Sequence, residues 1–263
     1  MLAFYKWVTK HKTLAMWLFS AIEIFIYASL LYSIHCPMWA IYLVALVLMI
    51  INYMFAYSAQ QLLLKKPLET LSRSGDPDPL FFITEELLTF KSSETNRELL
   101  LINHCVALRE RGELQRVHDI LTGINIDKHA GTPPYIKAVY YNNLADILDL
   151  LGDSAQADIW YAKMMQIYTD MPENRFKRAL KNTVLLSSAE HCLRQGECNQ
   201  ALQLLRSVEH DGLQRSISVA LLCARASLQM SERESARQHL QYIIANGNRL
   251  YAVTIAQELL NNL

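Results

Sequence analysis

The sequence predicts an all-α protein: an N-terminal transmembrane helical hairpin followed by an α-solenoid of about four helical pairs. Three observations support this fold class. Two long apolar stretches lie within the first sixty residues, strand-like alternation is nearly absent from the remainder, and short turns recur along it. Glycine and proline number only 8 and 7 among 263 residues, which favours helices over loop-rich folds.

The two apolar stretches cover residues 13–34, which hold one charged residue, and residues 38–57, which hold none. Each has about the twenty residues that a helix needs to cross a hydrocarbon core of about 30 Å. The connector between them is too short for anything except a tight reversal. We therefore expect residues 13–57 to form a hairpin in a lipid bilayer. A cleaved signal peptide fits less well, because the first run is too long and a second follows at once.

Basic residues flank this hairpin, whereas its connector has none. They are Lys6, Lys10 and Lys12 before the first span, and Lys65, Lys66 and Arg73 after the second. By the positive-inside rule, both termini face the cytoplasm. The sequence thus predicts an integral membrane protein with a cytoplasmic flank at residues 1–12, a juxtamembrane linker at 58–77 that is interrupted at Pro67, and a cytoplasmic helical domain at 78–263. Five cysteines without C-x-x-C spacing fit a reducing compartment.

One acidic residue, Glu23, lies near the middle of the first span, where an ionised carboxylate costs roughly 3 kcal/mol or more. Ser20 and Tyr27 share its helical face, and Asn52 on the second span lies within reach of its side chain. Two interpretations are open for these four residues. They form a hydrogen bond inside the hairpin, or they meet another membrane helix from a second copy or a partner protein. A proton path is less favoured because a single acid has no relay.

Chemistry-bearing motifs are missing from the sequence. It has no G-x-x-x-x-G-K-[ST], G-x-G-x-x-G, H-E-x-x-H or G-x-S-x-G motif. The connector contains His35, Cys36 and Met38, all possible copper ligands, but a simple turn is the better interpretation. Formal net charge is zero and the basic residues are mixed with acids, so nucleic-acid binding lacks its electrostatic signature. We expect no enzyme activity, cofactor, metal or nucleic-acid partner.

Four turns in the second part of the chain share one pattern, centred on Gly112, Gly152, Gly196 and Ser231. Seven positions before and five after each centre stand small or nearly small residues, and larger apolar residues follow nine and twelve positions after it. Antiparallel helices approach closely only where small side chains face each other, and glycine provides the backbone freedom that ends the first helix. The small residues are Cys105, Ala145, Ala189 and Ala224 before the turns, and Val117, Ala157, Ala201 and Ala236 after them.

This pattern, over residues 96–245, resembles the tetratricopeptide repeat family, with flanking helices expected at 78–92 and 249–262. The turns are 40, 44 and 35 residues apart, from the numbers of their centres, whereas the family repeats every 34 residues. Longer loops between the pairs account for the difference. The resemblance implies a concave face, built by the first helix of each pair, that holds a peptide or helix of another protein.

Polar residues at exposed-looking positions of those first helices are the candidate groove. Asparagine suits peptide capture because its amide both donates and accepts hydrogen bonds. The leading hypothesis is a membrane-anchored scaffold or adaptor that binds other proteins, and the alternative is a peptide-binding receptor or regulator coupled to a membrane partner. The groove residues are Asn103, Arg109, Asn142, Asn143, Asp146, Asp149, Glu190, Arg194 and Arg225.

Overall fold

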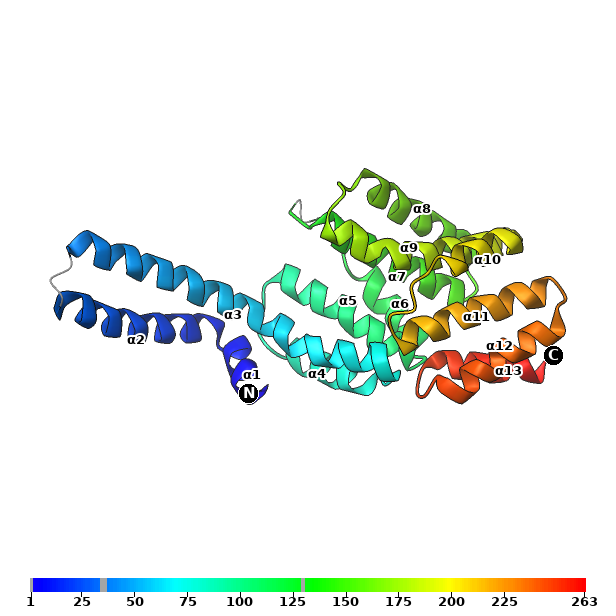
Figure 1. The fold of residues 1–263 in the computed structure, drawn as a ribbon, viewed down its shortest axis with the longest axis horizontal. Helices are drawn as coiled ribbons and strands as arrows, with labels where there is room; N and C mark the ends of the chain where they lie inside the picture. The colour runs from blue at the N-terminus through cyan, green and yellow to red at the C-terminus, as the bar shows by residue number, and fades with distance from the viewer. Residues whose placement is uncertain (1, 34–36, 129–130) are drawn as a thin grey trace. The chain divides into compact units, whose positions relative to one another are not determined.

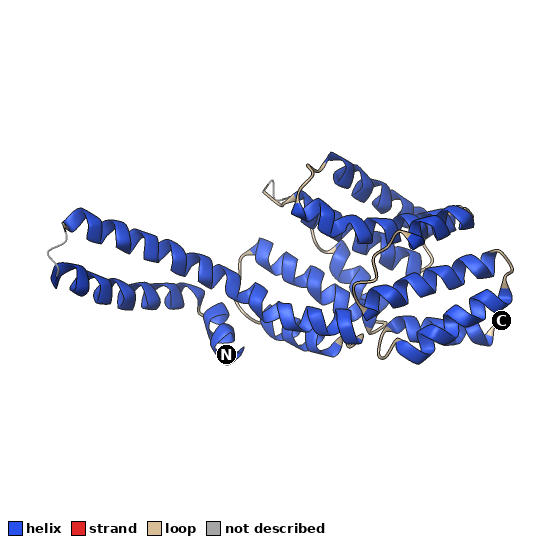
Figure 2. Ribbon diagram, viewed as in Figure 1, coloured by secondary structure: helices blue, strands red, loops and turns tan. Residues whose placement is uncertain are grey.

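The computed structural model describes residues 2–33, 37–128 and 131–263. Within these ranges the secondary structure comprises thirteen α-helices and no strand, which confirms the all-α prediction (Figure 2). His35 and Cys36, the suggested connector ligands, lie outside the described residues. The chain divides into two compact units, one of them the chain up to Pro67 with residues 89–91, and the other residues 68–88 with 92–263.

The first unit contains α1 (Leu2–Lys10), α2 (Lys12–Ser33) and most of α3 (Met38–Ser74). Helices α2 and α3 are each long and apolar enough to cross a membrane. The N-terminal flank, for which no structure was expected, forms α1. Its Phe4 ring lies 5.9 Å from the ring of Phe19 and its Tyr5 ring lies 6.1 Å from that of Phe55, so aromatic packing holds α1 against the start of the hairpin.

Helix α3 continues through Pro67, so the expectation that this proline interrupts the linker is wrong. Proline inside a helix removes a backbone hydrogen bond and costs about 3 kcal/mol. In the second unit the following turns are held by packing. Leu71 is buried, and the amide of Asn248 donates to the carbonyl of Ser74 at 2.7 Å. Tertiary contacts thus override the local preference.

The second unit is built from consecutive helical pairs with a further helix at each end (Figure 1). Helix α4 (Asp78–Leu88) packs on the first pair and α13 (Tyr251–Asn261) on the last, close to the two flanking ranges expected from the sequence. The four pairs are α5 (Glu94–Glu110) with α6 (Leu114–Thr122), α7 (Pro134–Leu150) with α8 (Ser154–Asp170), α9 (Arg175–Arg194) with α10 (Cys198–Arg206), and α11 (Leu213–Gln229) with α12 (Arg233–Asn246).

The four turns within these pairs have the same backbone geometry. Their centres have φ values of +80°, +87° and +76° at the glycines and +61° at Ser231. In each turn the following residue donates its N–H to the carbonyl five positions earlier, as Asp153 does to Leu148 at 2.8 Å. This arrangement ends an α-helix and favours glycine because the left-handed conformation strains other residues. The sequence therefore located all four turns correctly.

Close packing within each pair follows from the small residues around the turns. All eight of them are at most 3% exposed, and Leu121, Leu205 and Leu240 farther along the second helices are equally buried. The predicted spacing of small and large side chains is confirmed for these positions. It lets the two helices of a pair touch along their length and leaves the first helices free to contact one another.

The first helices of the pairs, with α13, form a closed series of contacts. Helix α5 contacts α7, α7 contacts α9, α9 contacts α11, and α13 contacts both α11 and α5. A Cβ atom added to Gly112 would lie 2.6 Å from the ring of Tyr251, which shows how closely the first turn approaches α13. The last helix thus returns to the first pair. The concave groove expected on these first helices stays a prediction.

Candidate functional site

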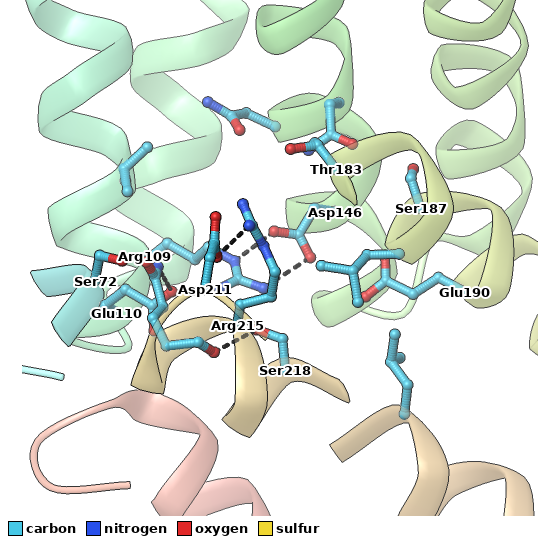
Figure 3. A pocket seen from close by; sticks show the side chains of 16 residues that line it. Ser72, Arg109, Glu110, Asp146, Thr183, Ser187, Glu190, Asp211, Arg215 and Ser218 are labelled. Carbon is cyan, nitrogen blue, oxygen red and sulfur yellow. Dashed lines mark hydrogen bonds and ion pairs between the residues drawn. The ribbon is translucent and has the colours of Figure 1, made fainter. Parts of the chain in front are cut away.

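The space between the inner helices is a cavity of about 210 Å³ (Figure 3). Its walls come from α5, α7, α9 and α11, with contributions from the last turn of α3 and from the loop before α11. Most of the lining residues are polar, but polar and apolar atoms contribute about equally to the surface, and Val106, Leu186 and Leu222 are among the apolar residues. Its ionisable side chains are Arg109, Glu110, Asp146, Glu190, Asp211 and Arg215.

Arg109 is the hub of one side of the cavity. Its guanidinium donates to Glu110 at 2.6 Å and to Asp146 on α7 at 3.1 Å. Burial acts to lower the pKa of Arg109, but the two carboxylates outweigh it and raise that pKa, so the guanidinium stays charged. Gln214 of α11 donates to Glu110 at 2.8 Å. One cluster of side chains thus joins three inner helices.

A second cluster lies around Asp149, whose side chain is only 3% exposed. It accepts hydrogen bonds from Arg194 at 3.3 Å and from both terminal nitrogens of Arg225 at 3.1 Å. Asp149 and Arg194 are therefore buried and do not occupy the exposed positions expected of them. The reason is that α9 and α11 cover this face and bring Arg194 and Arg225 against Asp149.

Arg194 also connects this cluster to α8. Its Nε donates to Asp158 at 2.8 Å, and His191 contacts the same carboxylate oxygen at 2.9 Å. Burial acts to raise the pKa of Asp158, but the hydrogen bonds from His191 and Arg194 together hold it below the ordinary value. The His191 ring stacks on Tyr161 with centroids 4.4 Å apart. These contacts fix the outer side of α9 and so position its inner face.

Glu190, on that inner face, differs from the other acids of the cavity. Among the described residues it takes part in no hydrogen bond or ion pair. Burial, with repulsion from Asp146 and Asp149, raises its pKa to about 8, against the opposing effect of Arg109 and Arg225. The carboxyl group of Glu190 therefore holds its proton at neutral pH unless a further positive charge enters the cavity.

The structure brings most of the predicted groove residues to one place. Arg109, Asn142, Asn143, Asp146 and Glu190 line the cavity. Arg225 lines an adjoining space of about 40 Å³ with Arg109 and Glu190. Asn103 lines neither space, and its side chain donates to the carbonyl of Leu99, one turn earlier on α5, at 2.9 Å. Glu110, Asp211, Gln214 and Arg215 were missed by sequence reasoning, since the contact of Glu110 with Gln214 spans 104 positions and leaves no local signal.

The hairpin has its own polar cluster. Asn52 donates to Glu23 at 2.8 Å and to Ser20 at 3.3 Å, and both Asn52 and Ser20 are buried. Tyr27 is 46% exposed. The hydrogen bond inside the hairpin, one of the two interpretations of Glu23, is thus present in the structure. A contact with a second membrane helix stays a prediction.

Comparison with models of protein families, with curated protein sequences and with solved structures finds no match for this chain. The function is therefore inferred from the geometry of the two polar clusters and the cavity. Three features define the site: its walls are four inner helices, its charges are mostly paired, and one acid is unpaired. Such an arrangement can bind a polar group.

Proposed function

We propose that this chain is a membrane-anchored interaction protein whose cytoplasmic helical domain recruits another protein. Helix α2 and the apolar part of α3 cross the bilayer, and the helical pairs form a tetratricopeptide-like domain. The anchor is supported by the length and apolar composition of both helices. The orientation is supported by lysines on both sides of the hairpin and by free, mostly buried cysteines in the domain.

The charged cavity is the observation that carries the interaction role. Buried ion pairs contribute little net stability, because desolvation offsets their attraction. A domain that needed only stability would fill this space with apolar side chains, as it does between the helices of each pair. Six ionisable groups around an open space of about 210 Å³ are better explained by the binding of a polar partner segment.

The small volume favours a second candidate, a peptide-binding receptor or regulator coupled to a membrane partner. Pockets for drug-sized ligands measure about 300–1,000 Å³, and this cavity lies below that range. It therefore accepts a short segment or a single side chain and not the face of a folded protein. In both candidates the cavity is the recognition site, and the ligand's size distinguishes them.

The proposal is tested with the tagged full-length chain in its native membranes. Alkaline carbonate extraction comes first, followed by solubilisation in mild detergent and identification of the copurifying proteins. Asn142→Ala removes a polar group from the cavity wall, and Asn199→Ala, at an exposed position of α10, is the matched control. We expect a membrane-bound chain that retains a defined protein, at least a fivefold loss of that protein with Asn142→Ala, and no loss with Asn199→Ala.

Release of the chain by carbonate would contradict the anchor. Equal recovery of the same proteins by both asparagine variants would contradict a recognition role for the cavity. A peptide in place of a protein in the purified complex would favour the receptor over the scaffold.

A further inference from the structure

The balance of charge in the cavity indicates what it binds. Two arginines and four acids line the cavity. Arg109 pairs with Glu110 and Asp146. Arg215 pairs with Asp211 one turn earlier in the chain. These pairs use both arginines, and the fourth acid, Glu190, forms no ion pair among the described residues.

The residues around Glu190 show that the shortage of positive charge extends over the whole inner face. The neighbouring arginines, Arg194 and Arg225, are bound to Asp149. Burial, followed by repulsion from Asp146 and Asp149 on α7, disfavours a negative charge on Glu190 despite the opposing effect of Arg109 and Arg225. Negative charge is therefore in excess, and a positively charged group placed beside Glu190 would be attracted by several acids in a poorly solvated space.

A second polar atom in the wall lacks a partner. The side-chain nitrogen of Asn143 on α7 is buried and donates to no acceptor among the described residues. A buried donor without an acceptor is unfavourable, so a ligand that brings a carbonyl oxygen would be stabilised there. The cavity wall thus has a carboxyl group, Glu190, that could accept from a cation, and an amide donor, Asn143, that could bind a carbonyl oxygen.

We infer that the cavity binds a basic side chain, arginine or lysine, of a polypeptide segment, with the cation at Glu190 and a backbone carbonyl of the same segment at Asn143. This inference rests on the proposed function, since it names the chemistry of the partner segment. A cavity of about 210 Å³ is suited to one long side chain. Arginine carries five donors, which allows it to contact Glu190 and a paired acid together.

The test uses a matched pair of uncharged and charged probes. N-acetyl-Gly-Arg-Gly-amide and its citrulline counterpart have nearly the same shape and differ in charge. Both are titrated calorimetrically into the full-length chain in detergent micelles, as wild type, as Glu190→Gln and as Glu258→Gln. Glu258 is an exposed acid on α13, so its variant removes one charge away from the cavity.

We expect the arginine probe to bind wild type at least tenfold more tightly than the citrulline probe. Glu190→Gln should abolish this preference, and Glu258→Gln should preserve it. Equal binding of the two probes, absence of binding by the arginine probe, or an unchanged preference in Glu190→Gln would overturn the inference. If Glu190→Gln fails to fold by circular dichroism, the comparison of the two probes on wild type decides alone.

The two proposals fail in different ways. If Asn142→Ala loses the copurifying protein while the probes bind equally, the interaction role stands and the basic side chain is wrong. If the arginine probe binds through Glu190 while native membranes yield no specific protein, the site stands and the recruitment role is wrong.

Discussion

Replacing Glu190 with glutamine should make the helical domain more stable at alkaline pH and leave it nearly unchanged at acidic pH. Burial and the two nearby aspartates raise the pKa of Glu190 from 4.5 to about 8 in the folded chain. In the unfolded chain the group has its ordinary pKa. Between these two values the folded state holds a proton that the unfolded state has lost, so stability falls as the pH rises.

The size of the effect follows from that interval. One pKa unit corresponds to about 1.4 kcal/mol, so the full interval of about 3.5 units sets a ceiling of about 5 kcal/mol. Between pH 6 and pH 9 only the part up to pH 8 counts, which lowers the ceiling to about 3 kcal/mol. Glu190 is partly exposed to water in the cavity, and screening should reduce this to about 1–2 kcal/mol. That corresponds to a change of about 4 °C in Tm for a domain of this size.

The assay is thermal unfolding of the full-length chain in detergent micelles, followed by circular dichroism at pH 6 and pH 9. The measured quantity is the Tm of Glu190→Gln minus that of wild type at each pH. Groups that titrate in both proteins cancel in this difference. Glu258→Gln, which removes an exposed carboxylate, should show no dependence of its difference on pH.

A difference in Tm that is the same at pH 6 and pH 9 would refute the reasoning. It would mean that Glu190 loses its proton at an ordinary pKa in the folded chain. The repulsion of Glu190 by Asp146 and Asp149 would then be balanced by the nearby arginines, which removes the reason to expect that a further cation is attracted there.

Two further predictions concern the closed series of helix contacts and the hairpin. Gly112→Ala should lower the free energy of unfolding in urea by about 1–3 kcal/mol more than Gly196→Ala does. Both glycines have positive φ, but only an alanine at position 112 would meet Tyr251. Equal losses would contradict the close approach of the first turn to α13. Asn52→Leu should weaken the hairpin by about 1 kcal/mol in SDS titration, and adding Glu23→Leu should restore that loss. Independent effects of these two changes would argue against their hydrogen bond.

The helical pairs could be predicted from sequence because their determinants are local. A turn centre with positive φ, a small residue seven positions before it and another five positions after it all lie within a dozen residues. Gly152 shows this in full, with Ala145 and Ala157 both buried. Even Ser231, which lacks the freedom of glycine, adopts the same turn because the surrounding pattern is intact.

The return of α13 to α5 could not be predicted, because it depends on contacts between distant segments. Nothing near Gly112 shows that Tyr251 will pack against it, and nothing near Pro67 shows that the next turns will be held by Asn248. The same limit applies to the predicted groove residues. A helical periodicity identifies the polar face of α7 but does not show that α9 and α11 cover Asp149.

The contact of α13 with α5 also has a consequence for how the domain forms. Stacked repeats usually gain stability one neighbour at a time, so part of an array can stand alone. Here the first pair lacks one of its neighbours until Tyr251–Asn261 has been synthesised and has returned to it. Such long-range contacts slow folding. The nascent chain would expose the acids of its half-built interior until then, and the domain should unfold as one cooperative block.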